Sequence, residues 1–243
     1  MISIIIPFYN EENQLEKTLA PLIPYFDKLE IIAVNGKSTD QSKEILEKYP
    51  NIKILDSAQG RAIQMNKGAA IAQGEIFLFL HADTVLGEGW YQALIDTDHE
   101  FQAGAFSLGT DQNNWFIYLV KIFTFIRTKL GLHTAYGDQA IWVRKDAFEM
   151  LSGYKEIPIM EEVDLIDRLK KITKIKILSV QAYTSIRRWQ EEGQIRATIK
   201  NISALLLYRM KVDYSTIRKI YNSDTYPWDK RFKGTFQSPV NLG

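Results

Sequence analysis

Short runs of β-branched and other apolar residues recur in the first part of the chain and alternate with segments of helical spacing. The runs cover residues 2–6, 30–34, 52–55 and 76–80. Between them, apolar residues return every three or four positions, as at Leu15, Leu19 and Leu22, which predicts helices. Strands that alternate with helices are typical of parallel βαβ units. The run at 76–80 contains no polar residue, which indicates a strand buried on both faces of its sheet.

The alternation is looser in the second part of the chain. Strands are expected near 105–108, 140–143 and 175–180, and helices at 114–130, 162–172 and 195–210. No linker rich in glycine, serine or charge interrupts the sequence, so we expect one domain over residues 1–222. Residues 1–104 would form a Rossmann-like, nucleotide-binding half, and residues 105–222 would form the second wall of a cleft. Residues 223–243 lack periodicity and are expected to be a C-terminal tail.

Composition and charge exclude several classes of protein. Lys and Arg total 30 and Asp and Glu total 29, so no overall field attracts nucleic acid and any phosphate site has to be local. The chain has no cysteine, which excludes disulfides and thiolate metal sites and fits a reducing compartment. The apolar start at residues 2–6 is too short for a signal peptide. We therefore expect a cytoplasmic protein.

Two apolar helical segments bear on membrane contact. The segment 115–126 is about half the roughly 20 residues that a spanning helix needs and contains Lys121, so no integral membrane insertion is expected. This segment and residues 195–210, with the bases Arg196, Lys200, Arg209 and Lys211, could rest on the inner membrane surface. Core packing or a homodimer contact explains the same pattern, and we favour it because the charges are few and the apolar stripes are of ordinary width.

Polar side chains follow three of the predicted strands at the point where each strand ends. They lie in Pro7-Phe8-Tyr9-Asn10-Glu11-Glu12, in Asn35-Gly36-Lys37-Ser38-Thr39-Asp40 and in His81-Ala82-Asp83-Thr84. Ligands of open parallel sheets bind beyond the carboxyl ends of the strands. These segments are therefore the candidate site. None contains the G-x-G-x-x-G turn of dinucleotide-dependent oxidoreductases, and no glycine-rich triphosphate loop of a nucleotidyltransferase follows the first strand.

In this order and at this spacing, the three segments resemble the donor-site signatures of family 2 glycosyltransferases. The resemblance covers most of the chain. More narrowly, the segments 60–68, 81–84, 137–140 and 184–189 resemble a bacterial subgroup associated with radical-SAM or selenium-linked gene neighbourhoods.

The resemblance implies an A-type glycosyltransferase fold, with a mostly parallel central sheet flanked by helices. Residues 1–104 would then bind a nucleotide-sugar, and residues 105–222 would bind the acceptor. The implied reaction is an inverting transfer of a sugar from a nucleotide-diphosphate sugar of the UDP or GDP type to an unidentified hydroxyl acceptor. A divalent metal, Mn²⁺ or Mg²⁺, is implied as the cofactor.

Asp83 is the candidate metal ligand. A sugar diphosphate leaving group carries about two negative charges, which a carboxylate-bound Mg²⁺ or Mn²⁺ can neutralise as the glycosidic bond breaks. The alternative is that Asp83 caps a helix beginning near Gly89. The family usually has a carboxylate at the position of His81, and a histidine there could contact the ribose or assist with Mn²⁺.

The remaining donor-binding candidates come from the first two loops and the third helix. Pro7, Tyr9 and Glu11 resemble the loop that meets the nucleoside, although Asn10 could simply cap a helix. Asn35 stands where the family commonly has an aspartate that contacts the base, while Thr39 and Asp40 are expected to cap the second helix.

Arg61 opens the third helix after Gly60, where backbone N–H groups and a guanidinium can both face an anion. Asn66 resembles the family's helix asparagine, and its alternative role is a solvent-facing polar residue.

Glu162 is the candidate general base that deprotonates the acceptor, at a position usually held by aspartate. Asp164 is the reserve candidate. Alternatively, Glu161, Glu162 and Asp164 simply stabilise the N-terminus of the following helix.

The acceptor side is predicted to contain Gly137, Asp138 and Gln139, together with Arg188 and Trp189, which resemble the family's late Arg-Trp motif. A tryptophan can stack on a sugar, and the alternative is a core tryptophan. A protein that kept the fold and binds a nucleotide or glycan without catalysis is the competing functional class, argued from Asn35, His81 and Glu162.

Overall fold

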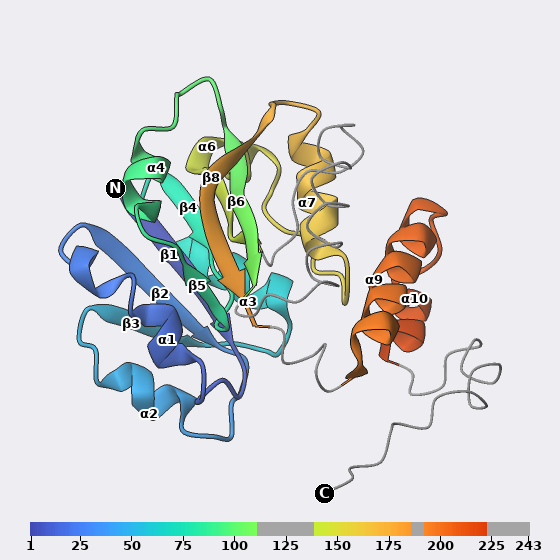
Figure 1. The fold of residues 1–243 in the computed structure, drawn as a ribbon, viewed down its shortest axis with the longest axis horizontal. Helices are drawn as coiled ribbons and strands as arrows, with labels where there is room; N and C mark the ends of the chain where they lie inside the picture. The colour runs from blue at the N-terminus through green and yellow to red at the C-terminus, as the bar shows by residue number, and fades with distance from the viewer. Residues whose placement is uncertain (111–138, 186–191, 223–243) are drawn as a thin grey trace, which may run out of the picture.

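The protein folds around one sheet flanked by helices (Figure 1). The structure, a computed structural model, describes residues 1–110, 139–185 and 192–222. The strands are β1 (Ile2–Phe8), β2 (Leu29–Asn35), β3 (Ile52–Asp56), β4 (Ile76–Phe79), β5 (Thr84–Leu86), β6 (Ala103–Thr110), β7 (Ile141–Arg144) and β8 (Ile175–Thr184). The helices are α1 (Leu15–Leu19), α2 (Ser42–Glu47), α3 (Arg61–Ile71), α4 (Trp90–Ile95), α6 (Lys145–Met150), α7 (Glu161–Leu169), α9 (Gln194–Arg209) and α10 (Tyr214–Asn222), with a 3₁₀ turn at Ile23–Tyr25.

The sheet formed by the described residues has the strand order β3-β2-β1-β4-β7-β6-β8-β5. The strands β3, β2, β1 and β4 are parallel, as the βαβ rhythm predicts. β7 then runs antiparallel to both β4 and β6, and β5 runs antiparallel to β8, while β6 and β8 are parallel. The α/β class is confirmed. The expectation of a mostly parallel sheet is confirmed as well: β3, β2, β1, β4, β6 and β8 run in one direction, and among the described strands β7 and β5 run against them, which makes the sheet mixed.

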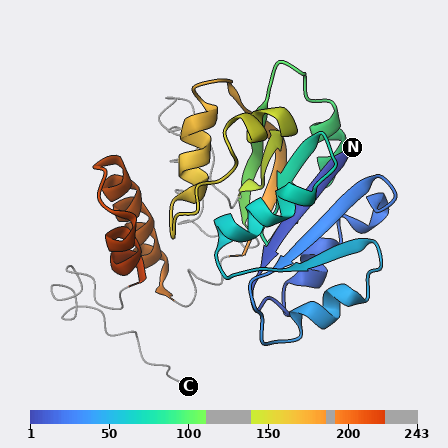
Figure 2. The ribbon, with the colours of Figure 1, turned by 180° about the vertical axis from the view of Figure 1, so that it is seen from behind.

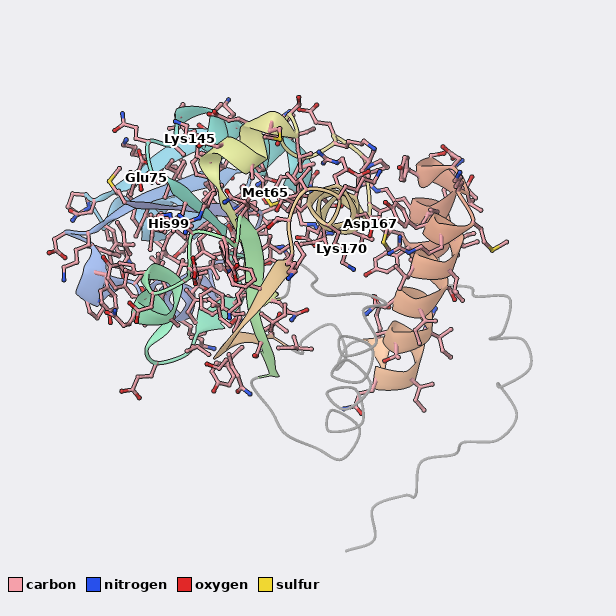
Figure 3. The ribbon with its side chains drawn as sticks, turned by 90° about the horizontal axis from the view of Figure 1, so that it is seen from above. Met65, Glu75, His99, Lys145, Asp167 and Lys170 are labelled. Carbon is pink, nitrogen blue, oxygen red and sulfur yellow. The ribbon has the colours of Figure 1, made fainter. Side chains whose placement is uncertain are left out.

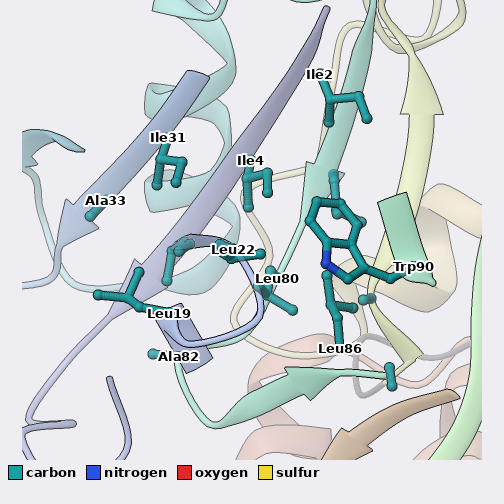
Figure 4. Packing of buried hydrophobic residues seen from close by; sticks show 14 of the residues in the cluster. Ile2, Ile4, Leu19, Leu22, Ile31, Ala33, Leu80, Ala82, Leu86 and Trp90 are labelled. Atoms are coloured by element: carbon teal, nitrogen blue, oxygen red, sulfur yellow. The ribbon is translucent and has the colours of Figure 1, made fainter. Parts of the chain in front are cut away.

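The core has two layers, one on each face of the sheet. Alternate residues of a strand point to opposite faces, so Ile4 packs with Leu19 and Trp90 on one side while Ile5 packs with Met65 on the other. Figure 4 shows Ile4, Leu19, Leu22 and Trp90 in the first layer. The helices α1, α2 and α4 contribute to that layer, and α3, α6 and α7 contribute to the second (Figures 1 and 2). Burial on both faces explains the unbroken apolar run at 76–80.

Gly68 lets α3 approach the sheet closely. A Cβ atom at this position would lie 2.6 Å from Ile5 Cγ2 and 3.2 Å from Val34 Cγ2. Both distances are too short for an unshifted contact, so a side chain here would push the helix away from β1 and β2. The close packing holds α3 directly against β1 and β2.

Several local expectations need correction. α1 begins at Leu15, and Asn10 does not cap it: the Asn10 side chain accepts a hydrogen bond from the backbone N–H of Thr39 at 2.8 Å. The N-cap of α2 is Gln41, so neither Thr39 nor Asp40 occupies the capping position, although Asp40 Oδ1 accepts a hydrogen bond from the N–H of Ser42, the first residue of α2, at 3.1 Å. The sequence reading missed β5, α6 and α10, and the helix expected at 114–130 lies outside the described residues.

The helices α9 and α10 form a hairpin beside the sheet domain (Figure 1). It is attached through a small apolar cluster of Ile159, Ala204 and Ile217. An ion pair joins Arg209 on α9 to Asp167 on α7 at 2.6 Å, at the junction seen in Figure 3. Within the part of the chain that the structure describes, no helix is long and apolar enough to cross a membrane.

Candidate active site

A cavity of about 580 Å³ opens where the carboxyl ends of β1 and β4 meet the start of α3. Its wall combines segments that are far apart in the sequence. The lining residues are Pro7, Phe8, Tyr9, Glu11, Gln59, Gly60, Arg61, Ala62, Ile63, Gln64, His81, Ala82, Asp83, Glu156, Ile157, Pro158, Glu161 and Arg218. The structure thus brings six of the predicted donor-site residues together: Pro7, Tyr9, Glu11, Arg61, His81 and Asp83.

The first two polar loops hold each other in place through backbone donors. The N–H of Glu11 bonds to Ser42 Oγ at 2.8 Å, and the N–H of Glu12 bonds to Asp40 Oδ2 at 3.1 Å. These bonds fix the loop after β1 at the cavity mouth. Tyr9 stays 43% exposed there, available to an incoming ligand.

Asn35 lies beneath these loops and does not reach the cavity wall formed by the described residues. Its Nδ2 donates to Asp56 Oδ1 at 2.9 Å, and its Oδ1 accepts the N–H of Ser38 at 2.8 Å. The bond from Asn35, together with Lys43, lowers the pKa of Asp56. Asn35 therefore shapes the loop, and the structure does not support a direct contact with the base.

Gln64 is a site residue that the sequence reading missed. Its buried Nε2 donates to the carbonyl oxygens of Phe8 at 2.9 Å and Val34 at 2.8 Å, so it ties α3 to the ends of β1 and β2. Gly36 makes room for it, since a Cβ there would lie 2.9 Å from Gln64 Oε1. A polar residue on the inward face of an amphipathic helix was the available signal.

Arg61 and Glu161 form an ion pair across the cavity wall. The Arg61 Nε lies 2.7 Å from Glu161 Oε1, with Glu161 almost fully buried and half of the Arg61 side chain exposed. Burial raises the pKa of Glu161, Arg61 counteracts part of that rise, and the neighbouring Glu162 adds to it. The Nε side of the Arg61 guanidinium is therefore occupied by the buried carboxylate of Glu161.

His81 and Glu162 form a second pair next to the first. His81 Nε2 lies 2.6 Å from Glu162 Oε1, and both side chains are only 12% exposed. Two consecutive acids at the start of α7 are thus each bonded to a cationic or titratable side chain from another element. Tyr154 lies close to this cluster: burial, followed by the charges of Glu162 and Glu161, raises the pKa of its phenol well above the ordinary value.

The turn that carries Asp83 is held from several sides. Thr18 Oγ1 donates to the carbonyl oxygen of Ala82 at 2.8 Å, Thr84 N–H donates to the His81 carbonyl at 3.1 Å, and Ser185 N–H donates to the Asp83 carbonyl at 3.3 Å. The Asp83 carboxylate itself makes no hydrogen bond or ion pair with the described residues, and it lines the cavity. α4 begins after Gly89 with no side-chain cap in the described structure, so the capping alternative for Asp83 is wrong.

The carboxylate of Asp83 fits a metal ion that would be held jointly by the protein and by the phosphates of a bound substrate. Among the described residues, no group of three or more His, Asp or Glu side chains could enclose an ion. Mg²⁺ is commonly bound by one or two carboxylates together with substrate phosphates and waters. An unpaired carboxylate on the wall of a cavity large enough for a small-molecule ligand matches that donor set.

Two predicted residues have roles in the scaffold instead. Asn66 does not line the cavity within the described structure: its Nδ2 donates to the Tyr154 carbonyl at 2.8 Å and its Oδ1 accepts the Tyr154 N–H at 2.9 Å. Asp164, the reserve base, is buried and bonded at 2.6 Å to both Lys155 and Arg168. Neither side chain is available to a ligand in the cavity.

The acceptor-side predictions are only partly described by the structure. Gln139 is buried, and its Nε2 donates to the Phe106 carbonyl at 3.0 Å, so it supports β6 and does not present its amide to the cavity. Gly137, Asp138, Arg188 and Trp189 lie outside the described residues.

Sequence comparisons identify a family model. Residues 3–149, more than half of the 243-residue chain, match the model described as glycosyl transferase family 2. The probable glycosyltransferase YdaM of Bacillus subtilis is 24% identical over 218 residues, which are 79% of this chain and 51% of that protein. The poly(ribitol-phosphate) beta-glucosyltransferase of Bacillus spizizenii is 35% identical over 104 residues, 37% of this chain and 16% of that protein. The chain thus spans about half or less of these relatives.

Solved structures share the fold. Glucosyl-3-phosphoglycerate synthase from Mycobacterium tuberculosis, in complex with Mn²⁺, UDP and glucosyl-3-phosphoglycerate, matches with a TM-score of 0.62 at 18% identity, covering 88% of this chain and 81% of that one. The mannosyltransferase PcManGT from Pyrobaculum calidifontis, in complex with GDP-Man and Mn²⁺, matches with a TM-score of 0.59 at 15% identity, covering 84% and 60%. This chain has the same α/β architecture, with a central mixed sheet flanked by helices.

Proposed function

The chain belongs to glycosyl transferase family 2, and on that premise we propose that it transfers a sugar from a nucleotide-diphosphate sugar to a hydroxyl acceptor with inversion at the anomeric carbon. The observation that carries the proposal is the convergence of Tyr9, Arg61, His81 and Asp83 on one cavity of about 580 Å³. Ligand pockets for small molecules are of this size. The solved structures that share the fold contain UDP in one case and GDP-Man in the other, which favours a donor of the UDP or GDP type.

The donor would bind with its nucleoside against the loop after β1. Pro7, Tyr9 and Glu11 line the cavity there, and the exposed ring of Tyr9 offers a face to the base. Arg61 keeps half of its side chain exposed at the start of α3 while Glu161 orients its guanidinium. The diphosphate would therefore lie between the α3 N-terminus and Asp83.

Asp83 would hold Mn²⁺ or Mg²⁺ together with the diphosphate. When bound, the ion would neutralise charge on the leaving group. The protein would contribute one carboxylate, that of Asp83. Because the turn that carries Asp83 is held by hydrogen bonds, the carboxylate would keep a fixed position relative to Arg61.

Glu162 would act as the general base. As the acceptor oxygen attacks the anomeric carbon, its proton passes to the Glu162 carboxylate, and the bond from the anomeric carbon to the diphosphate oxygen breaks with its electron pair leaving on the nucleotide. Attack from the face opposite the leaving group inverts the centre. The imidazole of His81, 2.6 Å away, would orient the carboxylate by donating Nε2–H to it. A glutamate is one methylene longer than the aspartate that usually occupies this position. The hydrogen bond with His81 would compensate for that extra length, because it fixes where the carboxylate lies.

A direct assay tests this function against the competing class. Purified protein is incubated with UDP- and GDP-sugars, with and without Mn²⁺, and the release of nucleoside diphosphate is measured. Release from one donor supports a transferase. Tight binding of a donor without release, in the presence of candidate hydroxyl acceptors, would instead favour a nucleotide- or glycan-binding protein that lacks catalysis.

α9 supports a membrane contact, and we propose that it rests on an anionic lipid surface. Its exposed apolar side chains follow helical spacing along one stripe: Ile195, Ile199, Ile202, Leu206 and Met210. Residues 194–211 contain no Asp or Glu and four bases, Arg196, Lys200, Arg209 and Lys211. Arg209 and Lys211 are exposed at the C-terminal end of the helix, whereas Lys200 is buried and paired with Glu192 at 2.9 Å. Helices with an apolar stripe and basic flanks bind lipid surfaces that carry negative charge. A homodimer through the same stripe is the alternative outcome of the test given below.

Some finer assignments stay predictions. The radical-SAM- or selenium-associated subgroup depends on the motifs at 60–68, 81–84, 137–140 and 184–189. The division into a donor half at 1–104 and an acceptor half at 105–222, and the acceptor roles of Gly137, Asp138, Arg188 and Trp189, stay predictions as well.

A further inference from the structure

The C-terminal hairpin contributes a side chain to the cavity wall. Arg218, on α10, lines the cavity together with the loop after β1 and the turn that contains Asp83. It lies more than two hundred positions after Tyr9 in the sequence, on a helix that belongs to neither face of the sheet. Nothing in the donor-site motifs assigns it a role.

The position of Arg218 is fixed by its neighbour. Ile217 is fully buried in the cluster with Ile159 and Ala204, which sets the rotation of α10 about its own axis. Consecutive helical residues point about 100° apart, so burial of Ile217 directs Arg218 to a different side of the helix. The hairpin itself is attached to α7 by the ion pair of Arg209 with Asp167 at 2.6 Å. The presence of Arg218 at the cavity is thus a consequence of how the hairpin docks.

A diphosphate in this cavity would need a cationic side chain that is not already bonded to a carboxylate of the protein. Four carboxylates line it, those of Glu11, Asp83, Glu156 and Glu161, against the guanidinium groups of Arg61 and Arg218. Arg61 is bonded to Glu161 at 2.7 Å. Arg218 makes no hydrogen bond or ion pair with any of the described residues. Its planar guanidinium can bind phosphate oxygens in pairs, which a lysine ammonium cannot do.

We propose that Arg218 binds the diphosphate of the donor, so that the α9–α10 hairpin forms one side of the donor site. This inference rests on the proposed function, because it needs a nucleoside diphosphate in the cavity. With this role for Arg218, the C-terminal part of the described chain takes part in substrate binding. That part lies outside the segment 3–149 that matches the family model.

The test compares Arg218→Gln with Lys219→Gln. Both changes remove one positive charge from an exposed position of α10, but Lys219 does not line the cavity within the described residues. The affinities for UDP and GDP are measured by calorimetry, and those for uridine and guanosine by NMR titration, with Mn²⁺ present throughout. Arg218→Gln is expected to weaken diphosphate binding roughly ten-fold or more and to leave nucleoside binding unchanged. Lys219→Gln is expected to match the wild type, and Arg218→Lys is expected to lie between.

The outcomes separate this inference from the proposed function. If the wild type binds neither UDP nor GDP nor any other nucleoside diphosphate, both fail. If the wild type binds one of them and Arg218→Gln binds it equally well, only the role of Arg218 is overturned. An equal loss in Lys219→Gln, or an equal loss of nucleoside binding, would also overturn it, since either result indicates a general electrostatic or structural effect. Unchanged circular dichroism and melting temperature in both variants verify that the hairpin is intact.

Discussion

His81 Nε2 and Glu162 Oε1 lie 2.6 Å apart, which joins the turn after β4 to the first turn of α7. The pair connects two residues that are 81 positions apart in the chain. Beside it, Arg61 and Glu161 form a similar pair at 2.7 Å. Consecutive acids are therefore held by side chains from different elements, and the carboxylate proposed as the base has a fixed position before any acceptor binds.

Replacing Glu162 by glutamine is expected to lower kcat by about 10²- to 10⁴-fold, because the amide cannot take the acceptor proton. Donor affinity should change little, since Glu162 is not assigned a donor contact. The measurement is steady-state transfer with the donor found active, together with calorimetric donor binding. Glu149→Gln, an exposed change on α6, is the control. Wild-type kcat in Glu162→Gln would exclude Glu162 as the base.

His81→Ala is expected to lower kcat through Glu162. If His81 acts by orienting that carboxylate, the double variant with Glu162→Gln should lose no more activity than Glu162→Gln alone. A double-mutant cycle on kcat measures this non-additivity. Losses that multiply fully would show that His81 acts independently, for example on the ribose or the metal.

Glu161 should make stability depend on pH. Burial raises its pKa in the folded state above the reference value of 4.5. The folded protein then holds the proton more tightly than the unfolded chain, so the stability linked to Glu161 is fully present below about pH 4.5 and is lost as the pH rises through the folded pKa. Glu161→Gln does not titrate. The Tm of the wild type relative to this variant is therefore expected to fall as the pH rises above about 4.5.

The control for that experiment is again Glu149→Gln, whose Tm should stay parallel to the wild type across the same range. A constant difference between wild type and Glu161→Gln would contradict a raised pKa for Glu161.

The sequence predicted the first half of the fold better than the second, for physical reasons. β1 and β4 are buried on both faces, so β4 is apolar throughout and β1 is apolar except for Ser3, which makes both easy to recognise. β5 has only three residues, which are too few to show a pattern. α10 does have apolar residues at helical spacing, Tyr214, Ile217 and Tyr221, but it is short and buries only Ile217, so it was missed. The antiparallel insertion of β7 depends on pairings between distant segments, which periodicity does not report.

The site residues were also predicted only in part from the sequence. Tyr9, Arg61, His81 and Asp83 follow strands or open a helix, and the motif positions brought them together at the cavity. Asn66 and Gln139 have equally polar side chains in similar motifs, but backbone groups of other elements take up their amides. Which polar residues face the ligand was decided by tertiary hydrogen bonds that the sequence does not display.

The stripe on α9 is expected to bind anionic vesicles. The wild type should co-sediment with phosphatidylcholine vesicles that contain phosphatidylglycerol. The double variant Ile202→Glu with Leu206→Glu should bind these vesicles less, because charges then replace exposed apolar groups. Met150→Glu changes an exposed apolar residue on α6 and is the matched control. A dimer in solution that the α9 variant converts to a monomer, without vesicle binding by the wild type, would contradict the lipid contact.

The central claim is a donor site in which Asp83 holds a metal with a nucleoside diphosphate, and a thermal-shift panel tests it most directly. UDP, GDP, dTDP, CDP and ADP are each added with and without Mn²⁺ to the wild type, to Asp83→Ala and to the exposed control Asp27→Ala. The account predicts that one nucleotide raises the Tm in a Mn²⁺-dependent way, that Asp27→Ala keeps this shift and that Asp83→Ala loses it. No shift with any nucleotide, or a full shift in Asp83→Ala, would contradict it.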